Sequence, residues 1–205
     1  LRELGIEVIG IGFVHLGLNS VFQLPWKFFY LIKLIRHHRP DIVQTWMYHA
    51  DLVGGLAARL AGCHKVIWGI RNTDVFPGRG VSHFTSWIMK LCAILSGFIP
   101  HTILCVGNRA KATHADSGYT LSKMIVISNG YEVETYKSDL DIRHHIRQSL
   151  DVPSDALIIG SIGRFNEYKD HRGFVLASAN LASTDRRLYF LMVGRDIDSD
   201  NITLM

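Results

Sequence analysis

Residues able to bind a phosphate follow one predicted buried strand late in the chain. The stretch GSIGRFNEYKDH, residues 160–171, passes from a glycine-containing turn into a predicted helix. Glycines let the backbone approach a phosphate closely, and a helix amino terminus adds partial positive charge. Arg164 offers a planar fork of donors and Lys169 a compact charge. The spacing favours a diphosphate site that includes Gly163, and a solvated Arg and Lys on an ordinary loop is the alternative.

A second polar cluster follows the predicted strand at residues 41–46. His49 and Asp51 stand where that strand leads into a helix. At the carboxyl edge of a sheet their side chains could bind hydroxyl groups or transfer protons. The alternative is structural, with Asp51 as a charge at the helix start and His49 as a surface residue beside it.

Two more clusters follow predicted strands. Arg71, Asn72 and Asp74 come after the strand at residues 65–70, and Asn129 with Gly130 comes after the strand at 123–128. Ligands of open α/β sheets bind outside the carboxyl ends of strands, so the first of these clusters is a candidate to line a cleft. Asn129 and Gly130 lie at the predicted domain boundary, which makes them a candidate hinge or cleft lining. A plain turn is the alternative for the first cluster, and Asn-Gly is in the first place a turn signal.

The helix predicted at residues 25–38 is rich in aromatic residues and ends in the basic run RHHR, residues 36–39. Such a helix could lie on an anionic membrane surface, and a core helix with a solvated basic end is the alternative. The histidine pairs at 37–38 and 144–145 lack Cys or carboxylate partners at ligand spacing. We therefore expect no metal site at either pair.

Short predicted strands alternate with predicted helices along the chain, a pattern typical of βαβ units and parallel sheets. The alternation breaks in the polar stretch at residues 129–141, which is the best candidate for a domain boundary. We therefore predict two α/β domains, residues 1–130 and 131–205. The predicted strands are 7–13, 41–46, 65–70, 101–106, 123–128, 156–162 and 187–193, and the predicted helices are 25–38, 50–61, 82–95, 109–117, 143–150 and 171–183.

Composition narrows the function classes. The 205 residues are 48% hydrophobic and 20% charged, which excludes a disordered chain. The net charge of +4 is mild, and without a recognised motif nucleic-acid binding is the weakest candidate. Three cysteines in apolar context, with no CxxC pair, indicate reduced buried thiols and a cytoplasmic protein. The apolar stretch at residues 84–106 is interrupted by Lys90 and Pro100, so it fits a helix, a turn and a strand better than a membrane span.

Several of these segments, taken in order, resemble those of the retaining glycosyltransferases of family 4. The likeness is strongest to bacterial members that build surface polysaccharides, and it covers nearly the whole chain. The segments that carry it are DIVQTWMYHADLVGGLAARLAG (41–62), VIWGIRNTD (66–74), ISNGYE (127–132), IIGSIGRFNEYKDH (158–171) and FLMVGRDID (190–198).

The resemblance implies the GT-B fold, in which two Rossmann-like domains with parallel sheets face each other across a cleft. The first domain would bind the acceptor and the second the nucleotide-sugar donor. Arg164 and Lys169 match the family's positions for the donor diphosphate, where they would stabilise charge on the leaving group as catalytic residues. No protein nucleophile is required if the acceptor attacks the face from which the diphosphate leaves. Neither a metal nor another cofactor is expected.

The resemblance further implies transfer with retention to a saccharide, in particular a lipid-linked one, during cell-envelope polysaccharide biosynthesis. The enzyme would work in the cytoplasm, in peripheral contact with the inner membrane face. Many family members have His where this chain has Trp46 and Arg71. We therefore expect His49 to line the cleft instead, and Arg71 to contact a phosphate or the acceptor.

The family's first strand and glycine-rich loop would precede Leu1, and its glutamate-bearing donor motif would follow Met205. We accordingly expect a fragment, with both domains incomplete and without activity of its own. Two alternatives stay open. One is a GT-B relative such as a nucleotide-sugar epimerase, and the other is a non-catalytic module that binds membrane surfaces or carbohydrate.

Overall fold

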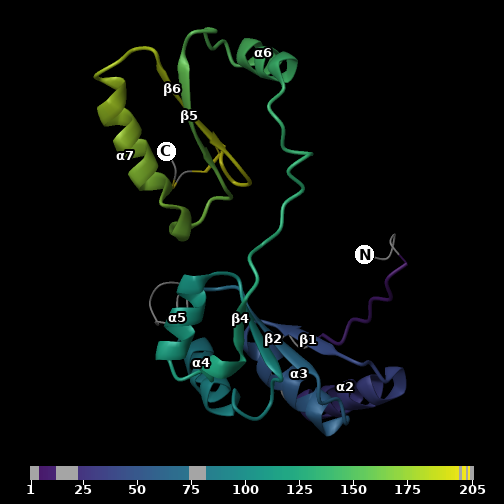
Figure 1. Ribbon diagram of the computed structural model, residues 1–205. Helices are drawn as coiled ribbons and strands as arrows, with labels where there is room; N and C mark the ends of the chain where they lie inside the picture. Colours follow the sequence, from purple (N-terminus) through teal and green to yellow (C-terminus); the bar gives the residue numbers. More distant parts are fainter. Residues whose placement is uncertain (1–4, 13–22, 74–81, 199, 202, 204–205) are drawn as a thin grey trace. The chain divides into compact units, whose positions relative to one another are not determined.

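The computed structural model describes residues 5–12, 23–73, 82–198, 200, 201 and 203. The chain divides into two compact units, Leu1–Tyr131 (unit 1) and Glu132–Met205 (unit 2), whose elements are labelled in Figure 1. The assignment of an acceptor-side and a donor-side domain to these regions stays a prediction.

Unit 1 is built on a parallel sheet with strand order β1-β2-β3-β4. Each strand pairs with the next one in the sequence, and a helix connects each pair, as expected of successive βαβ units. Its elements are α2 (Leu24–His38), β1 (Val43–Trp46), α3 (Tyr48–Leu60), β2 (Val66–Ile70), α4 (His83–Leu95), β3 (Thr102–Cys105), α5 (Asn108–Asp116), the short η2 (Leu121–Lys123) and β4 (Met124–Val126).

One face of this sheet forms the core of unit 1. Trp68, Ile70 and Ile103 are fully buried there, and α3 packs against both α2 and α4. Right-handed crossovers between neighbouring strands place the connecting helices on a single face of the sheet. On the other face, Trp46 is 47% exposed and Ile125 46% exposed. The open face therefore leaves apolar side chains available beside the carboxyl ends of the strands.

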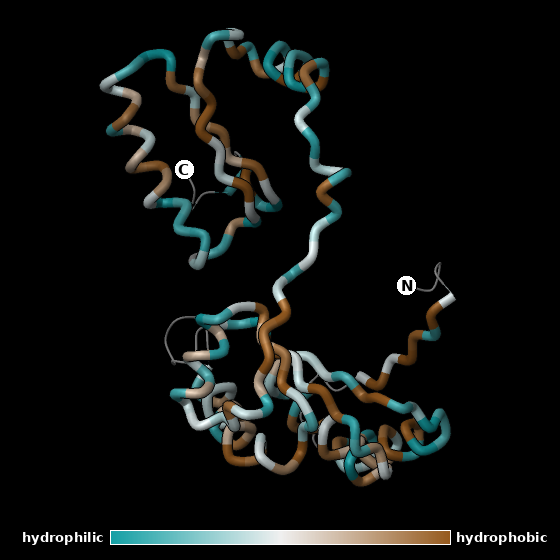
Figure 2. Tube along the Cα trace, viewed as in Figure 1, coloured by the Kyte–Doolittle hydropathy of each residue, from teal (hydrophilic) through white to brown (hydrophobic). Residues whose placement is uncertain are grey.

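Unit 2 contains two parallel strands, β5 (Leu157–Ile162) and β6 (Leu188–Val193), connected through η3 (Glu167–Lys169) and α7 (His171–Ala182). The helix α6 (Leu140–Ser149) precedes them. Buried Arg147 donates hydrogen bonds to the carbonyl oxygens of Pro153 at 2.6 Å and Ala156 at 2.9 Å, which ties α6 to the start of β5. Figure 2 shows mainly apolar colouring along the strands and mainly polar colouring on α6.

The predicted strand at residues 7–13 is wrong in its described part. Residues 7–12 form no strand, and residues 6–9 are exposed. A strand needs a hydrogen-bonded neighbour, and among the described strands β1 pairs with β2 alone. Phe13 lies outside the described residues. The other predicted strands and helices are confirmed, with their ends shifted by up to three residues.

Candidate functional site

The carboxyl ends of β1 to β4 surround a pocket of about 460 Å³ in unit 1. Parallel strands bring their carboxyl ends to the same edge of a sheet, so residues far apart in the sequence meet there. Arg71, Asn129 and Gly130, three of the residues predicted to line a cleft, all contribute to this pocket. The lining is Trp46, Arg71, Leu104, Cys105, Val106, Ile127, Ser128, Asn129, Gly130 and Tyr131.

Arg71 is held between two neighbours in this pocket. Its Nη2 atom donates a hydrogen bond to Asn129 Oδ1, and its Cζ atom lies 5.1 Å from the centroid of the Trp46 ring. A cation over an indole face is attracted by the ring quadrupole. A Cβ at Gly69 would overlap the Trp46 ring, so the ring owes its position to the glycine. The guanidinium is thus oriented by groups from β1 and from the segment after β4.

Asp51 lies inside unit 1, where it is 1% exposed. Its Oδ1 atom accepts a hydrogen bond from Thr45 Oγ1 at 2.5 Å, and the Gly69 backbone N–H also donates to its carboxylate. Burial raises the pKa of Asp51 to about 7, against the lowering effect of those two hydrogen bonds. The structure therefore places Asp51 where it ties α3 to the ends of β1 and β2, without access to solvent.

His49 and Asn72 are not among the residues that line the first pocket. The exposed His49 ring stands 5.8 Å from the Phe84 ring, measured between centroids. His49 contributes instead to a second pocket of about 630 Å³, whose lining is mainly apolar. Asn72 is half-buried next to Arg71. Asp74 lies outside the described residues.

Met47, at the turn between β1 and α3, has φ of 69° and ψ of 158°. An L-residue rarely adopts this conformation, and such strain concentrates at functional sites. Its backbone N–H donates to the Gly69 carbonyl oxygen at 2.9 Å, which extends the pairing of the two strands. The sequence offers no signal for this strain, because methionine does not mark a positive φ.

The loop after β5 in unit 2 is fixed by the end of β6. The backbone N–H of Gly163 donates to the Val193 carbonyl at 2.9 Å, and that of Phe165 donates to the Arg195 carbonyl at 2.8 Å. A Cβ at Gly194 would overlap the Gly163 carbonyl oxygen. This close approach of the two loops requires a glycine at position 194.

The predicted phosphate-binding residues come together at this loop. A Cβ at Gly163 would lie 3.3 Å from Lys169 Cδ, so the lysine side chain passes directly over the glycine. Arg164 is exposed, and within the described part of the chain no carboxylate pairs with Arg164 or Lys169. Asp170 caps α7 by accepting from the Gly173 N–H at 3.1 Å. Two cations without a described carboxylate partner thus stand beside a glycine and a helix start that Asp170 caps.

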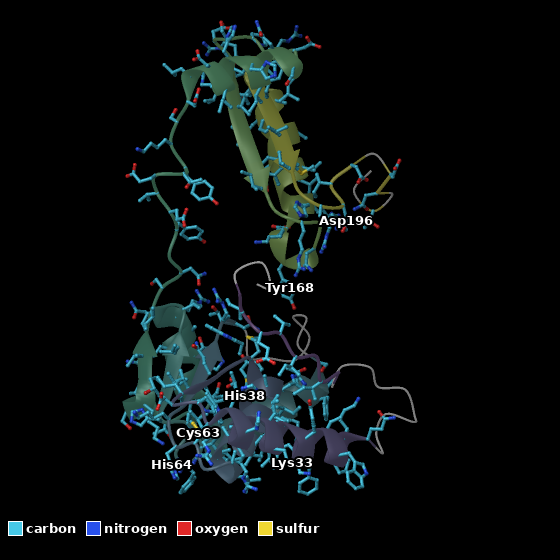
Figure 3. All side chains as sticks on the ribbon, turned by 90° about the vertical axis from the view of Figure 1, so that its right-hand side faces the viewer. Lys33, His38, Cys63, His64, Tyr168 and Asp196 are labelled. Atoms are coloured by element: carbon cyan, nitrogen blue, oxygen red, sulfur yellow. The ribbon has the colours of Figure 1, made fainter. Side chains whose placement is uncertain are left out.

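His171 is a further residue of this loop that was not expected from the sequence. Its Nε2 atom lies 3.1 Å from the Arg164 carbonyl oxygen, and its ring stacks on Phe165 with centroids 5.5 Å apart. The side chain is buried, and its Nδ1 atom has no hydrogen-bond partner among the described residues. His171 therefore supports the backbone of Arg164. Figure 3 labels two more residues of unit 2, Tyr168 in η3 and Asp196 in the loop after β6.

In the described parts of the chain, no group of three His, Cys, Asp or Glu side chains could hold a metal ion. Nor is any helix among those residues long and apolar enough to cross a membrane. The expectation that the reaction needs no metal or other cofactor stays a prediction.

The fold is Rossmann-like, and the polar groups described above gather at the carboxyl ends of parallel strands, where open α/β sheets commonly bind their ligands. The family model described as Glycosyltransferase Family 4 matches residues 2–135. The chain therefore belongs to glycosyltransferase family 4, as its sequence motifs indicated. No curated protein matches the sequence significantly.

Solved structures share the fold at low sequence identity. Anabaena HepE in complex with UDP-glucose superposes with a TM-score of 0.70 at 17% identity, covering 86% of this chain and 46% of HepE. Staphylococcus aureus MnaA with UDP gives 0.54 at 11% identity, covering 93% of this chain and 50% of MnaA. These likenesses confirm the predicted GT-B type fold, and the chain spans about half the length of the structures it matches.

Proposed function

We propose that the chain is part of a retaining hexosyltransferase that uses a nucleotide-sugar donor. The observation that carries the proposal is the pair of cations Arg164 and Lys169 beside Gly163, without carboxylate partners among the described residues. Membership of glycosyltransferase family 4 supports it. The UDP-glucose bound to HepE and the UDP bound to MnaA indicate the chemical class of the donor.

The chemistry assigned to unit 2 is stabilisation of the leaving group. The bond between the sugar C1 and a diphosphate oxygen breaks, and the acceptor oxygen forms the new bond to C1 on the same face. The acceptor hydroxyl proton passes to the departing diphosphate oxygen. Arg164 and Lys169 neutralise charge that grows on the diphosphate during bond cleavage, so their interactions are stronger in the transition state than in the ground state.

The pocket of unit 1 is assigned to the acceptor. The Trp46 ring offers an apolar face to the C–H groups of a saccharide, and Asn129 offers donors and acceptors to its hydroxyls. Arg71 supplies positive charge at the same place. His49, in the neighbouring apolar pocket, is likewise assigned to acceptor binding.

The cellular setting that we propose is the cytoplasm at the inner membrane face, during cell-envelope polysaccharide synthesis. The support comes from α2, which exposes Trp26 (77%), Phe29 and Lys33 and has no acidic residue. Aromatic residues favour the membrane interface, and cations favour anionic headgroups. Figure 3 labels Lys33 and His38 on this helix.

Titration calorimetry with UDP-glucose on the natural full-length protein tests the proposal. Replacing Arg164 and Lys169 together by Ala removes two charge-assisted contacts, and we expect affinity to fall about a hundredfold or more. The matched control replaces Arg143 and Lys137 by Ala. These are two exposed cations of unit 2 outside the loop, so this variant should bind UDP-glucose like the wild type. Equal affinity of both double variants would refute the assignment of the loop.

A further inference from the structure

Helix α4 carries apolar side chains on two faces. One face packs into the core of unit 1 through residues such as Ile88 and Cys92. On the other face Phe84, Trp87 and Ile94 are 62%, 60% and 71% exposed. A helix that is apolar all round is typical of one that its neighbours enclose on every side. Among the described residues, unit 1 covers only the first of these two faces.

The outward apolar residues of α4 recur at alternating intervals of three and four residues. With about 3.6 residues per turn, they form a stripe roughly 80° wide on the helix surface. Such a narrow stripe is the seam along which two helices pack side by side. A helix that lies on a membrane instead has a strongly charged face to turn to water, and the face of α4 opposite the stripe is buried. The α4 stripe consists of Phe84, Trp87, Leu91, Ile94 and, in the turn directly after the helix, Phe98.

The α4 stripe is large enough for association with a second copy of the chain. Its three aromatic residues and Ile94 are each exposed by 60% or more, which leaves about 500 Å² of apolar surface in water. Two copies that cover each other's stripe would bury about 1,000 Å² in total, which is the lower limit for a specific protein interface. The exposed His83 and Lys90 border the stripe, as polar groups border the apolar centre of an interface.

We propose that two copies of this chain pair through their α4 stripes. The two stripes have the same spacing, so the side chains of one copy fit between those of the other in a two-fold symmetric contact. Trp87 is the main anchor, because buried aromatic residues supply most of the binding energy of an interface. The small area predicts a dissociation constant on the order of micromolar. The stripe contains none of the residues assigned to the donor or the acceptor, so the pairing does not depend on the proposed function.

Sedimentation velocity of the natural full-length protein between about 1 and 100 µM tests this pairing. The double variant Trp87→Glu with Ile94→Glu places two charges at exposed positions of the stripe. The matched control is Trp26→Glu with Leu60→Glu, which changes an exposed tryptophan of α2 and an exposed leucine of α3. Phe98→Ser is a second test variant, and it leaves the residues of the helix itself unchanged. Circular dichroism verifies that each variant is folded.

We expect the wild type to dimerise within this concentration range. The double variant in the stripe should weaken the dimer about a hundredfold, because each copy would then bury two charges without partners. Phe98→Ser lies at one end of the stripe and should weaken the dimer about tenfold. The control variant should dimerise like the wild type.

A wild-type protein that stays monomeric throughout this range overturns the proposal. This holds also if the 205-residue chain dimerises under the same conditions, because the rest of the protein then covers the stripe, and if the monomer binds phosphatidylglycerol vesicles through the stripe. A dimer that both test variants retain, or that the control loses equally, overturns it as well, because another face then forms the contact. The UDP-glucose titration depends on Arg164 and Lys169, so the two proposals can fail separately.

Discussion

Gly69 sets the position of the Trp46 indole ring, which lines both the pocket that contains Arg71 and the mainly apolar pocket that contains His49. Trp46 pairs with Gly69 across β1 and β2, and a Cβ at position 69 would overlap the ring. The ring in turn holds the Arg71 guanidinium. The absence of a side chain at position 69 therefore determines where the Trp46 ring and the Arg71 guanidinium lie.

Gly69→Ala should accordingly destabilise unit 1 by about 1–3 kcal/mol, because the ring has to move away from the added methyl group. Urea unfolding followed by tryptophan fluorescence measures the change. Gly10→Ala is the control, since a Cβ there meets nothing within 4 Å. Equal stability of the two variants would show that the Trp46 ring does not depend on Gly69.

The buried carboxyl of Asp51 predicts a pH dependence of stability. Its pKa is about 7 in the folded protein against 3.8 as the ordinary value, so between these values the folded state binds more protons. Its contribution to stability is complete below about pH 4 and is lost as pH rises to 7. Asp51→Asn removes this titration while an amide oxygen can still accept from Thr45.

We expect the stability of Asp51→Asn relative to the wild type to rise by about 2–3 kcal/mol between pH 5 and pH 8. Urea unfolding at both pH values measures it. His114, whose pKa is lowered by burial, titrates in both proteins and cancels in the comparison. A pH-independent difference would mean that the Asp51 carboxyl titrates near its ordinary value.

At the scale of elements, the loops after β5 and β6 depend on each other. Gly163 and Phe165 donate to carbonyls of the segment that contains Gly194. Gly194→Ala should push the loops apart and remove hydrogen-exchange protection from the amides of Gly163 and Phe165. Gly160→Ala, in β5, should retain this protection, because a Cβ there would lie at an ordinary contact distance of 3.8 Å from the Leu191 carbonyl oxygen. Protection that survives in Gly194→Ala would show that the loops do not need their close approach.

The sequence predicted the positions of these elements well, because short apolar strands alternate with helices at regular spacing. It also predicted that Arg71 stands at the carboxyl edge of the sheet, since it directly follows a buried strand, and that Asn129 is a candidate hinge or cleft-lining residue. The strand predicted at residues 7–13 is wrong in its described part, because an apolar run forms a strand only if a neighbouring strand pairs with it. The apolar pocket could not be foreseen, since its lining comes from four elements whose packing is set by tertiary contacts.

The start of unit 2 is exposed and irregular. Residues 132–138 contain no helix or strand, and Lys137 forms a surface ion pair with Glu134. Exposed irregular segments are the preferred sites of proteolysis. Limited trypsin digestion should therefore cut early after Lys137 and release unit 1 from unit 2. Lys137→Gln should suppress that cut, and persistence of the same fragments would place the susceptible bond elsewhere.

The central claim is that this chain belongs to an enzyme that transfers a sugar from a nucleotide-sugar donor. The most direct measurement incubates the natural full-length protein with UDP-glucose and farnesyl phosphate-linked saccharide, and follows the products by mass spectrometry and NMR. We expect UDP release together with a glycosylated acceptor whose new linkage keeps the anomeric configuration of the donor, and loss of both when Arg164 and Lys169 are replaced by Ala. An unchanged acceptor with an epimerised nucleotide sugar, or transfer that survives both replacements, would contradict it.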